Sequence, residues 1–134
     1  MPSATIQVGF ASSILSLTVT SSDPQGSVQI TGSTINLKPS MTGESFDLTF
    51  VPDTSHDVTA ITGIEPGPPQ NTPSGQGLPT VSPSMAAVLG EFDLQCDYPE
   101  GSFSQEVTFS STLFFMTNNG AEHHDPSIAF NPPE

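Results

Sequence analysis

The stretch Val28-Gln29-Ile30-Thr31-Gly32-Ser33-Thr34-Ile35-Asn36-Leu37 decides the fold class, because it predicts two strands together with the turn that joins them. Apolar and polar residues alternate on both sides of Gly32-Ser33, a dipeptide typical of a two-residue type II′ turn. Closing this turn with Thr31 opposite Thr34 places all four apolar side chains of the stretch on one face. A shift of one residue would destroy this agreement. The sequence therefore predicts a β-hairpin with a fixed register.

The same alternation continues through most of the chain and predicts further strands. They lie in residues 5–10, 15–19, 46–50, 92–98, 107–116 and 128–130, with turns at 23–26 and 118–120. About eight short strands without a long helical period favour an all-β, antiparallel β-sandwich of the immunoglobulin-like type. A chain of 134 residues has the usual size of one domain, so residues 1–134 are predicted to form a single domain.

Residues 63–83 interrupt this pattern with six prolines and four glycines. Proline lacks the backbone N–H that a strand donates to its neighbour, and glycine weakens strands. The sequence therefore predicts a long Pro/Gly-rich surface loop over 63–83. Such a loop is either a recognition surface or a tolerated insertion between strands, and the sequence leaves both readings open.

The chain is short of basic residues rather than unusually rich in acidic ones. Lys38 is the only lysine or arginine, fourteen aspartates and glutamates oppose it, and the formal net charge is −13. Nucleic-acid binding needs several Lys or Arg contacts to phosphates, and anionic membrane surfaces attract the same residues. The sequence also lacks a glycine-rich loop followed by lysine and an arginine clamp for phosphate. We therefore expect neither nucleic acid nor a membrane as partner.

The densest group of metal-capable side chains is Glu122-His123-His124-Asp125, and His56 adds a further imidazole. Imidazole nitrogens and carboxylate oxygens suit zinc or copper if these segments converge. However, adjacent side chains on an extended chain point in opposite directions, so His123 and His124 rarely share one ion. The five residues are thus candidate metal ligands, and a solvated polar loop is the alternative.

Cys96 is the only cysteine, so a disulfide within the chain is excluded. It alternates in phase with Phe92 and Leu94, which indicates a small buried apolar residue. A blue-copper site would bring Cys, His and Met close together near the C-terminal end, and that spacing is missing after Cys96. The carboxylates Glu91, Asp93 and Asp97 could attract Ca²⁺, but they are more typical of a solvent-facing acidic ladder.

No motif indicates catalysis, because a Gly-x-Ser-x-Gly elbow is absent and the Ser-rich composition makes chance Ser–His–Asp proximity common. We therefore expect a protein that is not an enzyme and that needs no cofactor. Residues 1–16 lack the basic start and continuous apolar core of a secretory signal. No apolar segment approaches the roughly 20 residues that span a bilayer, so the expected localisation is cytoplasmic.

The C-terminal stretch resembles the ending of small bacterial proteins grouped as the DP-EP family. The resemblance is carried by a hydrophobic strand, then Asn118-Asn119-Gly120, then Asp125-Pro126-x-Ile128-x-x-Asn131-x-Pro133. It covers the last fifth of the chain, and Asn131 falls one residue later than in the family pattern. The resemblance implies a short β-rich domain with no established function, and it carries over no functional residue.

Taken together, these features favour a non-catalytic acidic module that acts through homo-oligomeric assembly or through binding a protein partner. One alternative is a metal-binding protein with its site in the 122–125 loop. A second alternative is a carbohydrate-binding sandwich, which is weakened by the absence of tryptophan and by a single tyrosine. Sugar-binding faces usually need such rings for stacking.

Overall fold

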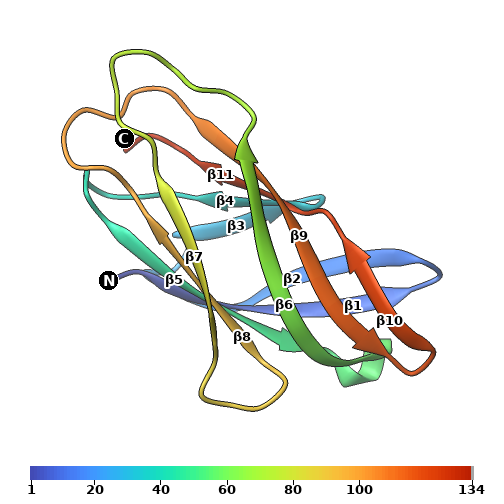
Figure 1. The fold of residues 1–134 in the computed structure, drawn as a ribbon. Helices are drawn as coiled ribbons and strands as arrows, with labels where there is room; N and C mark the ends of the chain where they lie inside the picture. The colour runs from blue at the N-terminus through green and yellow to red at the C-terminus, as the bar shows by residue number, and fades with distance from the viewer. Residues whose placement is uncertain (134) are drawn as a thin grey trace.

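The computed structural model describes residues 1–133 as two β-sheets and one short 3₁₀ helix, η1 (Thr54–His56) (Figure 1). The first sheet has the strand order β2-β1-β5-β8-β7. Its strands are β1 (Ser3–Ala11), β2 (Ile14–Asp23), β5 (Ser45–Pro52), β7 (Thr80–Met85) and β8 (Phe92–Asp97). The prediction of an all-β fold is confirmed.

The second sheet has six strands and is built around β9. Its strands are β3 (Val28–Thr31), β4 (Thr34–Leu37), β6 (Val58–Pro69), β9 (Val107–Thr117), β10 (Gly120–His124) and β11 (Ser127–Phe130). One edge of β9 pairs with β6, while the other edge pairs first with β11 and then with β10. From β11 the sheet continues through β4 to β3.

The hairpin β3–β4 has the register that its sequence predicts. Thr31 pairs with Thr34, Ile30 with Ile35 and Val28 with Leu37. Gly32 has a φ of 62°, the left-handed value that the first position of a type II′ turn requires.

The expectation of purely antiparallel pairing is wrong, because each sheet contains one parallel pair. β1 pairs with β5 in parallel, and β4 pairs with β11 in parallel. In both cases the two strands are far apart in the sequence, and no turn signal announces their contact. Both sheets are therefore mixed.

The expectation of a loop over residues 63–83 is also wrong. β6 continues to Pro69 and β7 begins at Thr80, which leaves only residues 70–79 irregular. β6 has one ladder partner, β9, and β7 has one, β8. Proline is tolerated on such edges because its missing N–H faces away from the ladder. The register of β6 also shifts between Pro66 and Pro69, where a bulge absorbs the prolines.

Inward-facing side chains of both sheets form one hydrophobic cluster. Its largest fully buried members are Phe46, Phe50, Phe115 and Phe130. Cys96 lies in this cluster as a free thiol, in agreement with its prediction as a buried apolar residue. Burial raises the pKa of this thiol, and Asp97 and Asp47 add to the effect. Within residues 1–133, no helix has the length and apolar character needed to cross a membrane.

Candidate functional site

The predicted metal ligands His123 and His124 lie on β10, at the edge of the six-stranded sheet. Their side chains occupy opposite faces of the strand. The His123 ring stacks on Phe114, with the two ring centroids 6.1 Å apart, while the His124 ring lies against Phe10 and Phe115. Pairing with β9 holds β10 extended, so the two imidazoles do not converge.

Glu122 and His56 are far apart in the sequence but lie near each other in the structure. Both line an open cleft of about 520 Å³ between the β1–β2 turn, η1 and the β9–β10 turn. Asp125 lies outside this cleft, in the segment that joins β10 to β11. In the part of the chain that the structure describes, no three His, Cys, Asp or Glu side chains gather as a metal-ligand group.

His56 is held by Asp53 rather than by the other predicted ligands. The Asp53 Oδ2 atom lies 2.7 Å from His56 Nδ1, and the Ser55 hydroxyl donates to Asp53 Oδ1 at 2.6 Å. These contacts, led by the Ser55 hydrogen bond, lower the pKa of Asp53, although partial desolvation acts against them. The imidazole packs over Gly9, where a Cβ atom would sit only 3.1 Å from His56 Cβ.

This Asp53–His56 pair resembles the base of a hydrolytic triad only in part. A nucleophilic serine must reach the imidazole nitrogen opposite the one that the carboxylate holds. Ser55 Oγ lies 3.2 Å from His56 Nδ1, which is the nitrogen that Asp53 already contacts. The pair therefore fixes the ring orientation but does not place Ser55 as a nucleophile.

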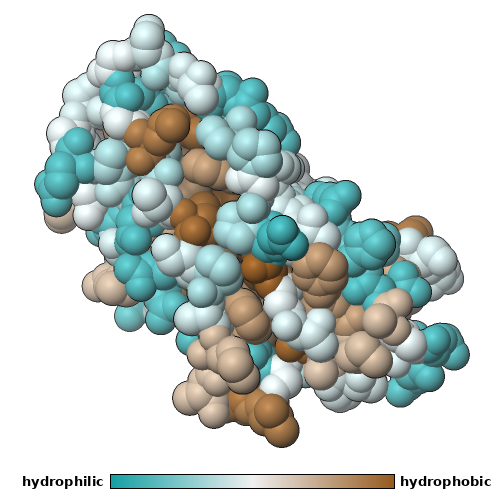
Figure 2. Space-filling view, viewed as in Figure 1, coloured by the Kyte–Doolittle hydropathy of each residue, from teal (hydrophilic) through white to brown (hydrophobic). Residues whose placement is uncertain are grey.

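A second feature is a group of exposed apolar side chains, which we call the apolar edge. It comprises Met85 at the end of β7 and Val88 and Leu89 in the β7–β8 connection, with exposed fractions of 80, 57 and 95%, and Phe114 and Met116 on β9. Figure 2 shows brown and tan atoms at the lower end of the molecule, where Figure 1 places the β7–β8 connection. Side chains of this size are normally buried.

The two parts of the apolar edge are connected through β6. The Ile61 backbone N–H donates to the carbonyl of Gly90 at 2.8 Å, which fixes the end of the β7–β8 connection against β6. On the other side of β6, Ala60 pairs with Met116 of β9. The exposed apolar residues thus adjoin one strand from both sides.

The surroundings of the apolar edge are acidic. Glu91 follows Gly90 directly, and the exposed Glu65 on β6 pairs with Thr112, two residues before Phe114. Lys38 lies near the opposite end of the six-stranded sheet, because β4 and β11 end where β9 begins. The apolar edge therefore has carboxylates nearby and no lysine or arginine.

Part of this site is predictable from the sequence. Phe114 and Met116 alternate out of phase with Leu113 and Phe115, a pattern that predicts an outward orientation, and both side chains are more than a third exposed. The run Met85-Ala86-Ala87-Val88-Leu89 was compatible with either a short helix or a strand. Its apolar composition next to Gly90 was the available signal for an exposed connection.

In comparisons with known proteins, no family model matches the chain and no curated protein is similar to it. The resemblance to the DP-EP family accordingly stays a prediction.

Proposed function

We propose that the chain is a non-catalytic, acidic β-sandwich module of the immunoglobulin-like type that binds a basic protein partner through the apolar edge. The sandwich arrangement is supported by the single hydrophobic cluster to which both sheets contribute. The immunoglobulin-like assignment rests on the short strands and the chain's repeated crossing between the two sheets, and it must accommodate the parallel pairs β1–β5 and β4–β11.

The observation that carries the proposal is the exposure of five large apolar side chains on adjoining segments. Scattered single apolar residues are normal on a protein surface, whereas contiguous ones typically mark an interaction site. Methionine and phenylalanine are also enriched at protein interfaces. Leu89 has the largest exposed fraction of the five, 95%, so we expect its burial against a partner to contribute the most to binding.

Charge favours a basic partner over a second copy of this chain. Two copies would each bring a formal net charge of −13, together with the Glu65 and Glu91 carboxylates beside the apolar edge. Like charges facing each other across an interface are unfavourable, whereas complementary charges accelerate association. A partner that combines apolar side chains with lysine or arginine fits both features of the apolar edge.

The test uses three synthetic peptides of equal length, composed of Leu and Lys, Ser and Lys, or Leu and Glu. We expect the Leu/Lys peptide to bind most tightly and to shift the backbone amide NMR signals of residues 86–90 and 113–117. The triple variant L89S/F114S/M116S keeps the charge of the protein and should weaken this binding at least about tenfold. Ser82→Ala, on the polar outer face of β7, is the matched control and should have no effect.

Three outcomes would overturn the proposal. Equal binding of the Ser/Lys peptide, or equal binding by the triple variant, would show charge attraction without use of the apolar edge. A dimer detected by light scattering and abolished by the triple variant would identify a second copy as the occupant.

A further inference from the structure

The five-stranded sheet ends in a long unpaired edge on β2. β2 stands at the end of the strand order and pairs with β1 alone. Unpaired backbone groups along such an edge offer hydrogen bonds to an incoming strand, and proteins usually prevent this with proline, charged side chains or short strands. The other strands that pair on one side only are β3, β6, β7 and β10.

Among the described strands, only β2 has a long edge without such a block. β6 and β7 contain prolines, β3 has four residues, and β10 has five residues, one of which is Glu122. β2 has ten residues and contains neither proline nor glycine. Its one ionisable side chain is that of Asp23, the last residue of the strand. The edge of β2 is therefore open to another strand in a way that the other edges are not.

The free backbone groups of this edge belong to Leu15, Leu17 and Val19. Residues 12–13 form a two-residue turn with positive φ values, and in such a hairpin the closing pair exchanges both of its hydrogen bonds. The backbone groups of Ile14 therefore point to β1. Because this direction alternates along a strand, the N–H and C=O groups of the other three residues point away from β1. Within residues 1–133, no backbone hydrogen bond outside the strand ladders engages them.

The side chains of the same three residues are covered only in part. Leu15, Leu17 and Val19 pack against the hydrophobic cluster but remain partly exposed. Their neighbours Ile6 and Val8 on β1, which pair with Val19 and Leu17, are 0% exposed. The inward row of β2 is thus half-covered, and a further strand beside it would bury more of this apolar surface.

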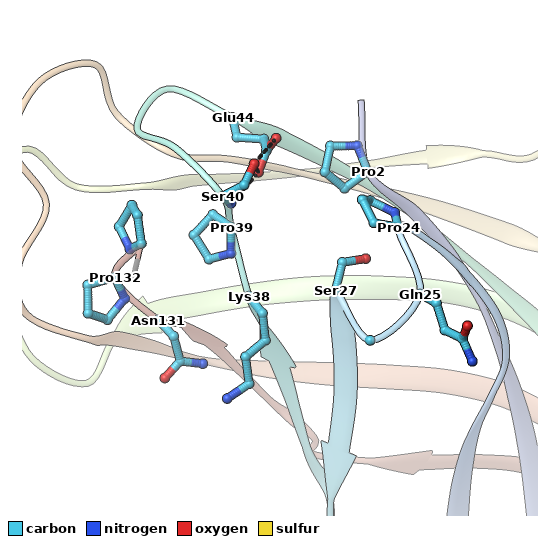
Figure 3. A pocket seen from close by; sticks show the side chains of 12 residues that line it. Pro2, Pro24, Gln25, Ser27, Lys38, Pro39, Ser40, Glu44, Asn131 and Pro132 are labelled. Atoms are coloured by element: carbon cyan, nitrogen blue, oxygen red, sulfur yellow. Dashed lines mark hydrogen bonds between the residues drawn. The ribbon is translucent and has the colours of Figure 1, made fainter.

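The open part of the edge ends before the turn that leads to β3. The register between β1 and β2 shifts towards the end of β2, and such a bulge bends the strand. Figure 3 shows Pro24 of the following turn next to Pro2. The Gly26 N–H donates to Ser22 Oγ at 3.2 Å, which holds this turn against the end of β2. Residues 14–19 are therefore the stretch on which another strand can lie.

The β1–β2 hairpin carries no charged side chain before Asp23. None of the fourteen acidic residues of the chain lies in residues 1–22, and lysine, arginine and histidine are also absent there. The outward Asp47 on β5 lies two strand spacings, or about 10 Å, from β2. That distance exceeds the Debye length of about 8 Å at physiological salt, so this carboxylate is largely screened. A second copy of the chain can therefore approach this edge without bringing like charges into contact.

An added strand must match the alternation of this edge, with apolar side chains toward the core and uncharged polar ones toward solvent. β2 itself has that pattern. We propose that two copies of the chain pair through residues 14–19 of β2, antiparallel and centred on Leu17, and so join their five-stranded sheets into one. Leu17 then lies opposite its own equivalent and Leu15 opposite Val19 of the second copy. The outward-pointing groups form about six hydrogen bonds.

This register keeps the carboxylates of the two copies apart. The two Asp23 side chains lie at opposite ends of the paired strands. Asp125 lines a hollow beside Ile14 and Leu15, and Leu15 is displaced from its own equivalent by roughly 14 Å along the strands. The contact is smaller than a standard protein interface, so the dimer is weak and reversible.

The test measures self-association by analytical ultracentrifugation from about 10 µM to about 1 mM protein. The variant S16E/T18E places like charges on the exposed side chains of the edge and should raise the dimer Kd at least about tenfold. S82E/S84E, on the exposed face of β7 at the opposite edge of the same sheet, makes the same change in net charge and is the matched control. Its Kd should stay within about twofold of the parent.

Amide hydrogen exchange tests the register itself. The amides of Leu15, Leu17 and Val19 should gain protection as the protein concentration rises, because only the dimer gives them a hydrogen-bond acceptor. Those of Ser16 and Thr18 bond to β1 in either state and should not change. Raising NaCl from about 0.05 M to about 0.5 M should strengthen the dimer by screening the net charge, whereas it should weaken binding of a basic partner to the apolar edge.

Three results would overturn this inference. They are a monomer at every concentration, a dimer that S16E/T18E leaves intact, and protection that rises equally at all five amides. The triple variant L89S/F114S/M116S should dimerise like the parent, so failure of this inference and failure of the proposed function are distinguishable.

Discussion

The outward faces of the two sheets differ sharply in what they expose. Where β5 pairs with β8 on the five-stranded sheet, the outward residues are all polar: Ser45, Asp47, Thr49, Asp93, Gln95 and Asp97. Several of them satisfy one another, as when the Thr49 hydroxyl donates to Asp93 Oδ1 at 2.8 Å. On the six-stranded sheet, the outward residues Phe114 and Met116 of β9 are apolar and remain more than a third exposed.

This difference shows that strand periodicity decides which side chains point inward, but not what the outward ones do. On the first sheet, Ser and Thr hydroxyls donate hydrogen bonds to Asp carboxylates on the neighbouring strand, so the polar side chains of this face bind one another. Across the neighbouring strands, Met116 pairs with Ala60 and Ala121, and Phe114 pairs with Gly63 and His123. Covering such an exposed apolar surface with a partner is favourable, so this face is the candidate for binding.

The largest effect should separate two adjacent phenylalanines that face opposite sides of β9. Phe115 is 1% exposed and Phe114 is 36% exposed. Phe115→Ala should lower the free energy of unfolding by about 3–5 kcal/mol, because it leaves a cavity in the core. Phe114→Ala should change it by less than about 1 kcal/mol. Urea denaturation measures both, and Phe115→Leu is available if the alanine variant is too unstable. Similar losses for the two residues would refute the assigned orientation of β9.

A smaller effect should appear on the polar face when one hydroxyl donor is removed. Thr49→Val deletes the hydrogen bond to Asp93 and should cost about 1 kcal/mol, measured as a shift of the urea midpoint. Thr5 pairs with Thr49 on the same face, and its hydroxyl has no carboxylate partner, so Thr5→Val is the matched control. If both substitutions were neutral, the cross-strand pairs would contribute nothing to the stability of this face.

Much of the fold was predictable because local rules agree with the tertiary structure along most of the chain. In the β3–β4 hairpin, the turn chemistry of Gly32 and the alternation of apolar residues specify the same register. Where partners come from distant segments, the sequence offers no comparable signal. The parallel contacts of β1 with β5 and of β4 with β11 belong to this second class.

The prolines misled the prediction for a physical reason. A proline in a central strand removes a ladder hydrogen bond, so prolines such as Pro66 and Pro83 favour a loop over residues 63–83. Each lies instead on a strand with one ladder partner, where the loss has no cost. Of the candidate ligands, only the opposite facing of His123 and His124 could be derived from the sequence.

The polar face should also show a dependence on pH. Burial raises the pKa of Asp47, and the nearby Asp93 carboxylate adds to this effect. A pKa that is higher in the folded state means that folding favours the protonated form, so stability declines as the pH rises through that value. Asp47→Asn should therefore be more stable than the parent at pH 7, by less than about 1 kcal/mol because the side chain is only half-buried. The difference should vanish below the ordinary aspartate range, and a less stable variant at pH 7 would contradict it.

The smallest expected effect is the response to zinc, which tests the predicted ligands on β10 directly. A ligand that binds only the folded state stabilises it in proportion to the logarithm of its concentration over its Kd, so a two-histidine site would raise the unfolding temperature. His123 stacks on Phe114 and His124 on Phe115, on opposite faces of a paired strand, so one ion cannot reach both. We therefore expect equimolar Zn²⁺ to leave the unfolding temperature of the parent unchanged. A rise that either His123→Ala or His124→Ala abolishes would mean that both imidazoles bind the same ion. Because pairing with β9 is what separates them, β10 would then have to leave the sheet.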